Sequence, residues 1–276
     1  SEELAIGAEP LMAMTGPVAM DGEKLLTNVG IKASLLSRFM ATGDRRAVPP
    51  GVVIPLHNVK EKQPEAIFDQ VQSLADWATP SSKVIVRSCA ADEDMNGFSA
   101  GRYDSAITEL NAGALHQALT TVVRSIQCRH ADVTELPHAV LIQPFITAQF
   151  TGVAFSHDPL NPLVGLIEYS KRAEAITSAR DVAETVQIDR GRKRPLSTDS
   201  AHKTGIEDNV LRQIWRYCKA AELMVEGPVD MEWAYDGSQV YVLQIRSQYD
   251  LEAAPAEAYE RWRLASHKSW KAAATT

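Results

Sequence analysis

The stretch VDMEWAYDGSQVYVLQIR, residues 229 to 246, constrains the fold of this chain more than any other. Two runs rich in β-branched and aromatic residues flank an Asp-Gly pair, a pattern typical of a β-hairpin. Four polar side chains stand in these runs where apolar ones would be expected: Asp230, Glu232, Gln244 and Arg246. The pattern predicts a polar site on one face of a sheet.

The length of the turn decides whether the four polar side chains share a face. Side chains alternate across a strand, so the two carboxylates share one face of the first strand, and the amide and guanidinium share one face of the second. A two-residue turn, Asp236-Gly237, would split these pairs between faces. A three-residue turn, Asp236 to Ser238, sets Asp230 opposite Gln244 and gathers all four. We predict the three-residue turn, because the alternative leaves a carboxylate and a guanidinium on opposite sides of one sheet.

The gathered side chains offer hard oxygen ligands beside a cation. A carboxylate oxygen from Glu232 and an amide oxygen from Gln244 suit Mg²⁺. Arg246, one step along the strand, suits a phosphate that the metal would bridge. A solvent-facing hairpin with ordinary ion pairs is the alternative that the hairpin alone leaves open.

Composition narrows the class of protein. A chain of 276 residues, 45% hydrophobic, can bury a core as one large domain or two lobes. The formal net charge of −7 argues against a sequence-independent grip on nucleic acid. We find no apolar run long enough to span a bilayer, and the first residues, SEELAIGAEP, lack the features of a signal peptide. We therefore expect a cytoplasmic protein with no nucleic acid or membrane partner.

Hydrophobic periodicity predicts helices mixed with strands along the whole chain. Helices are expected from near Gly30 to 40, at 62–77, 113–127 and 206–224, and in the tail from 251. Strands are expected at 82–88, 138–145 and 151–159, at both ends of 164–189, and in the hairpin. The mixture favours α+β lobes over a regular alternating barrel.

Four segments resemble, in the same order, the ATP-binding domain shared by phosphoenolpyruvate synthase, pyruvate phosphate dikinase, glucan water dikinase and rifampin phosphotransferase. They are NVGIKASLLSRF…VPPGVVIP, VIVRSCAADEDMNGFSAGRYDS, VLIQPFITAQFTGVAFSHDP and PVDMEWAYDGSQVYVLQIRS. The resemblance implies an ATP-grasp-like α+β fold with nucleotide held between two lobes. We expect these lobes at residues 1–138 and 139–250, followed by a helical tail at 251–276.

The resemblance assigns roles to residues from both lobes. Lys32 and Arg87 would neutralise the phosphates of ATP, one as a point charge and one as a bidentate clamp. Glu232 and Gln244 would hold Mg²⁺, and Arg246 would stabilise charge on the transferring phosphoryl group. Further nucleotide contacts are expected from Ala100, Gly101, Arg102 and Ser105 in a phosphate-covering loop, from Gln143 beside the adenine, and from Glu174 in the second lobe.

The sequence departs from the family pattern in its glycines. VGIKAS keeps one glycine and Lys32 but loses the neighbouring glycines, and Arg102 stands where the family usually has glutamine. The segment SKRAEA replaces Gly-Leu-Gly-Glu and keeps only Glu174. These losses make backbone approach to phosphates harder, and Lys171 or Arg172 could compensate through their side chains.

The resemblance implies an ATP-dependent phosphotransferase that uses Mg²⁺. Its acceptor would be a small molecule or a histidine on a separate phosphohistidine-domain protein. His157 is the one histidine expected near the cleft, in a structural role. Two alternatives stay open: a nucleotide-binding regulatory subunit that has lost its chemistry, and an ATP-grasp ligase that joins a carboxylate to an amine.

Overall fold

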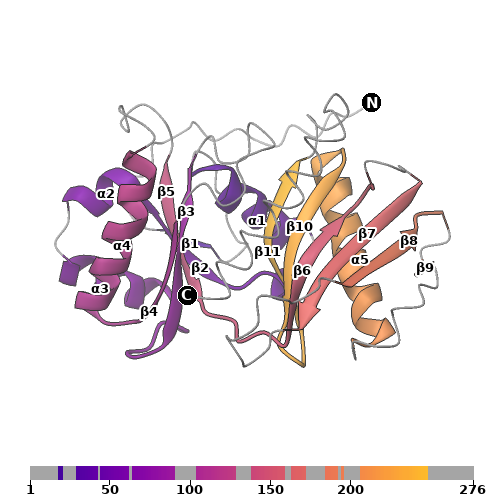
Figure 1. Cartoon of the computed structure of the whole chain (residues 1–276). Helices are drawn as coiled ribbons and strands as arrows, with labels where there is room; N and C mark the ends of the chain where they lie inside the picture. The colour runs from indigo at the N-terminus through magenta and orange to yellow at the C-terminus, as the bar shows by residue number, and fades with distance from the viewer. Residues whose placement is uncertain are drawn as a thin grey trace.

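In a computed structural model of the chain, two antiparallel β-sheets stand side by side, with most helices on their outer faces (Figure 1). The structure describes residues 18–20, 29–42, 44–61, 64–90, 104–128, 138–158, 163–171, 184–191, 194–195 and 206–247. The predicted α+β class with two lobes is confirmed. Within these ranges, none of the helices has the length and apolar character that a membrane span requires.

The first sheet has five strands in the order β1-β2-β5-β3-β4. Their bounds are Val18–Met20, Gly51–Pro55, Ala139–Pro144, Lys83–Cys89 and Ser105–Glu109. Helices α2 (Leu56–Glu61), α3 (Pro64–Leu74) and α4 (Ala112–Gln127) lie on the outer side. Val84 and Val86 of β3 point into the core under α3 and α4, so the alternate residues Ile85 and Arg87 face the second sheet.

The second sheet has six strands in the order β11-β10-β6-β7-β8-β9. Their bounds are Val240–Ser247, Val229–Tyr235, Phe150–Phe155, Val164–Lys171, Glu184–Asp189 and Arg194–Pro195. Helix α5 (Asp208–Val225) covers the face that carries Met231 and Trp233. Because side chains alternate along β10, Asp230 and Glu232 face the first sheet.

Helix α1 (Ile31–Thr42) and the short 3₁₀ helix η1 (Arg45–Ala47) join the two halves. Although α1 precedes the first sheet's main strands, it contacts β11 and α5 of the second half. Its Leu36 and Phe39 share one core cluster with Leu141 of β5 and with Trp233 of β10. The Tyr217 hydroxyl of α5 donates a hydrogen bond to an Asp44 carboxylate oxygen at 2.8 Å. The two sheets are therefore held together by a common core.

The helices with long periodic patterns of apolar residues lie close to where the sequence predicts them. The helices expected at 62–77, 113–127 and 206–224 appear as α3, α4 and α5, with bounds within a few residues. The predicted lobe boundary between 138 and 139 does not coincide with the boundary between the sheets, because β5 pairs with β2 and β3. The expected tail helix and the middle of 164–189 lie outside the described residues.

Candidate functional site

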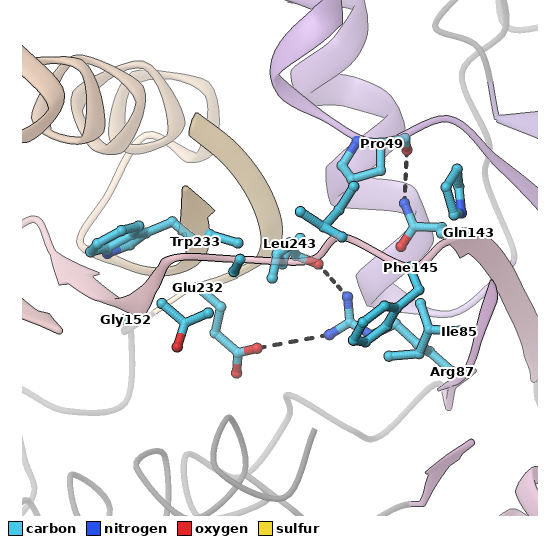
Figure 2. A pocket seen from close by; sticks show the side chains of 14 residues that line it. Pro49, Ile85, Arg87, Gln143, Phe145, Gly152, Glu232, Trp233 and Leu243 are labelled. Atoms are coloured by element: carbon cyan, nitrogen blue, oxygen red, sulfur yellow. Dashed lines mark hydrogen bonds and ion pairs between the residues drawn. The ribbon is translucent and has the colours of Figure 1, made fainter. Parts of the chain in front are cut away.

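A pocket with about 690 Å³ of empty space, partly open to solvent, lies between the two sheets (Figure 2). Most of its lining is apolar and includes Phe145, Ile146 and Ala148 from the segment that leaves β5. Its charged lining residues are Arg87 from the first sheet and Glu232 from the second. The pocket thus combines an apolar lining with one opposed pair of charges.

Arg87 connects the first sheet to the hairpin of the second. Its Nη1 donates to the backbone carbonyl of Leu243 at 2.6 Å, and its Nη2 donates to Gln244 Oε1 at 3.1 Å. Nη2 also lies 3.8 Å from Glu232 Oε2 (Figure 2). One planar guanidinium therefore contacts three groups that lie more than 140 residues away in the sequence.

The register of the hairpin differs from the prediction, although the predicted gathering of its polar side chains is confirmed. Tyr235 pairs with Val240, so the turn has four residues, and the three-residue turn was wrong. The reason is the Asp236 carboxylate, which accepts hydrogen bonds from the backbone N–H groups of Ser238 and Gln239, both at 2.8 Å. Such side-chain capping stabilises a longer turn than the strand pattern alone indicates.

With a four-residue turn and regular pairing, Glu232 would lie opposite Leu243, and Gln244 would point to the other face. A β-bulge shifts the pairing by one residue and brings Gln244 back to the face of Glu232. The register shifts between Trp233, which pairs with Val242, and Glu232, which pairs with Gln244. Leu243 is the extra residue, and the carbonyl of such a residue is not committed to the ladder. The Leu243 carbonyl can therefore accept the hydrogen bond from Arg87.

Arg246 lies between the two carboxylates of β10. Its Nη1 donates to Asp230 Oδ2 at 3.0 Å, and its Nη2 donates to Glu232 Oε1 at 2.5 Å. All three side chains are at least nine-tenths buried. Buried charges of this kind persist when they are paired and hydrogen-bonded.

The two carboxyl groups respond differently to this environment. Burial by itself would raise the pKa of Glu232, but the charges of Arg246, Arg87 and Lys32 outweigh burial and lower it. Burial raises the pKa of Asp230 to about 6, against the opposing effect of Arg246. Glu232 is therefore held as a carboxylate, while Asp230 titrates closer to neutrality.

Lys32 reaches the site from the first turn of α1. Its Nζ donates to the backbone carbonyl of Ser88 at 3.0 Å, and the side chain is 3% exposed. Gly30 just before the helix has φ of +80°, and a Cβ there would lie 2.2 Å from the carbonyl oxygen of Cys89. The glycine that VGIKAS retains is thus the one that lets α1 approach β3.

The remaining predicted residues fall in different places. Gln143 lines the pocket and donates from Nε2 to the carbonyl of Pro49 at 2.8 Å (Figure 2). Ser105 is the first residue of β4 and pairs with Arg87, so its placement in a loop was wrong. His157 lies beside Ser156 Oγ, at 3.0 Å, and is not among the residues that line the pocket. Four predicted contacts lie outside the described residues: Ala100, Gly101, Arg102 and Glu174.

Two groups in the site received no role from the sequence. Asp230 belongs to the predicted polar hairpin, and its two-residue spacing from Glu232 was the available signal that it shares the site. The Leu243 carbonyl had no such signal, because it is a backbone acceptor that only a bulge makes available. Asp230 Oδ1 is buried and has no hydrogen-bond donor among the residues that the structure describes.

The donor set fits a hard cation. Asp230, Glu232 and Gln244 supply oxygen atoms on one face of the hairpin, and Mg²⁺ typically takes one or two carboxylates together with phosphate oxygens. The buried Asp230 Oδ1, to which no group in the described part of the chain donates, is an oxygen that could bind such an ion. Within the described ranges, no group of three or more His, Cys, Asp or Glu side chains could hold a metal. The candidate set therefore depends on the Gln244 amide and on oxygens that a ligand would supply.

Comparisons with known proteins give matches in solved structures alone. No protein-family model and no curated protein matches the sequence. D-alanine-D-alanine ligase from Helicobacter pylori is 10% identical with a TM-score of 0.39, over 87% of this chain and 55% of that one. L-amino acid ligase from Bacillus licheniformis is 11% identical with a TM-score of 0.43, over 81% and 44%. The ATP-grasp ligase PsnB, complexed with a phosphomimetic precursor variant, Mg and ADP, is 15% identical with a TM-score of 0.35, over 88% and 58%.

This chain spans about half the length of each of these three proteins. Because no family model matches the sequence, the resemblance to the phosphoenolpyruvate synthase and pyruvate phosphate dikinase family stays a prediction.

Proposed function

We propose that this chain is an ATP-dependent enzyme with an ATP-grasp-like fold that binds Mg-ATP between its two sheets and transfers a phosphoryl group. The observation that carries the proposal is the pairing of Arg87 and Arg246 with Glu232, which together with Arg87 lines a largely apolar pocket; the charge of Lys32 also lowers the pKa of Glu232. Phosphoryl transfer needs mainly positioning and compensation of negative charge, which such a cluster supplies.

The lining of the pocket suits both parts of a nucleotide. The apolar residues, Phe145 among them, suit the flat face of a base, and Gln143 also lines the pocket. Arg87, in the same lining, has the planar fork that binds phosphate oxygens in pairs. Lys32 adds a compact charge from α1.

The metal would be held by Glu232 and Gln244, with Asp230 as a third ligand. Bound Mg²⁺ supplies positive charge to the phosphate oxygens and orients them for in-line displacement. In this arrangement Arg87 and Lys32 bind the phosphates, while Arg246 compensates the charge that develops on the transferring group. The cations therefore divide between binding and transfer.

The acceptor decides the class of enzyme. An acceptor carboxylate would take the γ-phosphoryl group to form an acyl phosphate, releasing ADP, and attack by an amine would then release phosphate and give a ligase product. Transfer of one phosphoryl group to a histidine of a partner protein and of the other to water or inorganic phosphate would release AMP and make the chain part of a dikinase. Binding without turnover would make it a regulatory nucleotide-binding subunit.

Titration calorimetry with a non-hydrolysable ATP analogue and Mg²⁺ tests the binding step. Chromatography of the nucleotide products, with candidate amino acid, peptide and histidine-protein acceptors, identifies the chemistry. Glu232→Ala should abolish metal-dependent turnover, whereas the matched variant Glu65→Ala, on the exposed face of α3, should retain it. Absence of nucleotide binding by the folded wild-type chain would refute the proposal.

A further inference from the structure

The oxygens that would hold a metal are already engaged by arginines. Arg246 donates to Asp230 Oδ2 and to Glu232 Oε1, at 3.0 and 2.5 Å. Arg87 donates to Gln244 Oε1 at 3.1 Å and lies 3.8 Å from Glu232 Oε2. Each of the three candidate ligands therefore has an oxygen that faces a guanidinium.

The two arginines are held differently. Arg87 has a backbone anchor at 2.6 Å, the Leu243 carbonyl, which persists whether or not the carboxylates take other partners. Arg246 instead donates to two carboxylates through separate nitrogens, and both of these bonds end on oxygens that a metal ion would take. A divalent ion between Asp230 and Glu232 would compete with this guanidinium for the same oxygens and would repel it.

We propose that Arg246 is a resident counter-ion of the Asp230–Glu232 pair, and that a divalent metal binds only once a phosphate has drawn the guanidinium away. This inference rests on the proposed nucleotide site and adds the order in which nucleotide and metal bind there. Phosphate offers Arg246 a bidentate acceptor of comparable strength, so the exchange moves one hydrogen-bonded cation between two anions. Because linkage is reciprocal, the arginine that excludes free metal also makes metal and nucleotide strengthen each other's binding.

The test measures binding of Mn²⁺ to the full chain without nucleotide, by the electron paramagnetic resonance signal of free Mn²⁺. The wild-type protein should bind the ion weakly. Arg246→Met should bind it at least roughly tenfold more tightly, within the usual range of such couplings. Arg246→Lys, which keeps the charge, should stay close to the wild type.

Arg190→Met is the matched control, because Arg190 forms a similar pair with Glu222 of α5, at 2.6 Å, on the other side of the sheet. It should leave Mn²⁺ binding unchanged. The gain in Arg246→Met should vanish in Arg246→Met/Glu232→Gln, which removes a ligand. If Arg246→Met does not fold, Arg246→Gln keeps a hydrogen-bonding side chain without the charge and should show the same gain.

Two results would overturn the inference: tight Mn²⁺ binding by the wild-type protein alone, or no gain in a folded variant that lacks the Arg246 charge. These outcomes are separable from failure of the proposed function. If the proposed function is wrong, the wild-type protein will not bind the non-hydrolysable ATP analogue. A folded protein that binds this analogue with Mg²⁺, but whose Arg246→Met variant gains no metal affinity, refutes the order of binding alone.

Discussion

Arg87 links the two sheets and also lines the pocket between them. It is buried, it donates to one backbone carbonyl and one amide oxygen, and it adds charge beside Glu232. A lysine in its place would keep a positive charge but could not serve the carbonyl and the amide at once, since it lacks the planar fork. Its contribution is thus geometric as well as electrostatic.

Arg87→Lys should therefore lose nucleotide affinity by at least roughly tenfold, or about 1.4 kcal/mol. The unfolding free energy should also fall, by up to the roughly 3–5 kcal/mol associated with a broken buried pair. Calorimetry with the ATP analogue and urea denaturation measure the two effects. Arg124→Lys, on the exposed face of α4, is the control and should change neither. Equal affinities for the two variants would contradict the role given to Arg87.

Asp230 makes the stability of the protein depend on pH in an unusual direction. Its pKa is raised by burial from 3.8 to about 6 in the folded state. The folded state thus holds this proton more tightly than the unfolded chain does, so the Asp230 contribution to stability decreases as pH rises from about 4 to about 6. Two pKa units correspond to about 3 kcal/mol.

Asp230→Asn should remove this decrease. We expect the unfolding free energy of the variant, relative to the wild type, to increase by up to about 3 kcal/mol between pH 4 and pH 7. Urea denaturation at intervals across that range measures the difference. Asp69→Asn, at an exposed position of α3, should show a pH-independent difference. A flat profile for Asp230→Asn would show that the shifted titration does not contribute.

At the scale of elements, the hairpin shows what alternation can and cannot predict. The placement of Asp230 and Glu232 on one face followed from their spacing, and the gathering of all four polar groups followed from their chemistry. The turn length did not, because the Asp236 carboxylate adds hydrogen bonds that no strand pattern encodes. The bulge at Leu243 restores the parity, and its presence depends on that turn.

Deletion of Leu243 should remove the bulge without changing the strand pairing on either side. Trp233 would still pair with Val242 and Glu232 with Gln244, so we expect the fold to persist. Arg87 would lose its carbonyl acceptor, and affinity for the ATP analogue should fall by roughly tenfold or more. The matched variant Leu243→Ala keeps the carbonyl and should lose less. Circular dichroism and calorimetry report the two properties.

At the scale of the molecule, α1 belongs to the first half of the chain but packs in the core of the second. Leu36 and Phe39 lie in one cluster with Trp233 and Ile245. The sequence predicted α1 and its apolar face, but local periodicity carries no information on which sheet that face meets. The effect of the Lys32 charge on the pKa of Glu232, 200 positions away, was likewise available only through the family resemblance.

Leu36→Ala should destabilise both halves in a single transition. Leu36 is fully buried, and truncation at such sites costs about 2–5 kcal/mol. Hydrogen exchange with mass spectrometry should show peptides from β3 and β10 losing protection at the same urea concentration. Leu223→Ala, at a site that is 76% exposed, should change stability by no more than about 0.5 kcal/mol. Separate transitions for the two sheets would contradict the common core.

The shared core also determines what would happen if the chain were split into two fragments. A break in the segment from Phe145 to Gln149, which connects the two sheets, would leave α1 on one fragment and the surface it covers on the other. Neither fragment would be soluble by itself, since each would present a broad apolar face to water. Expressed together, the two should reassemble, and the protein would behave as a split reporter whose signal depends on that encounter.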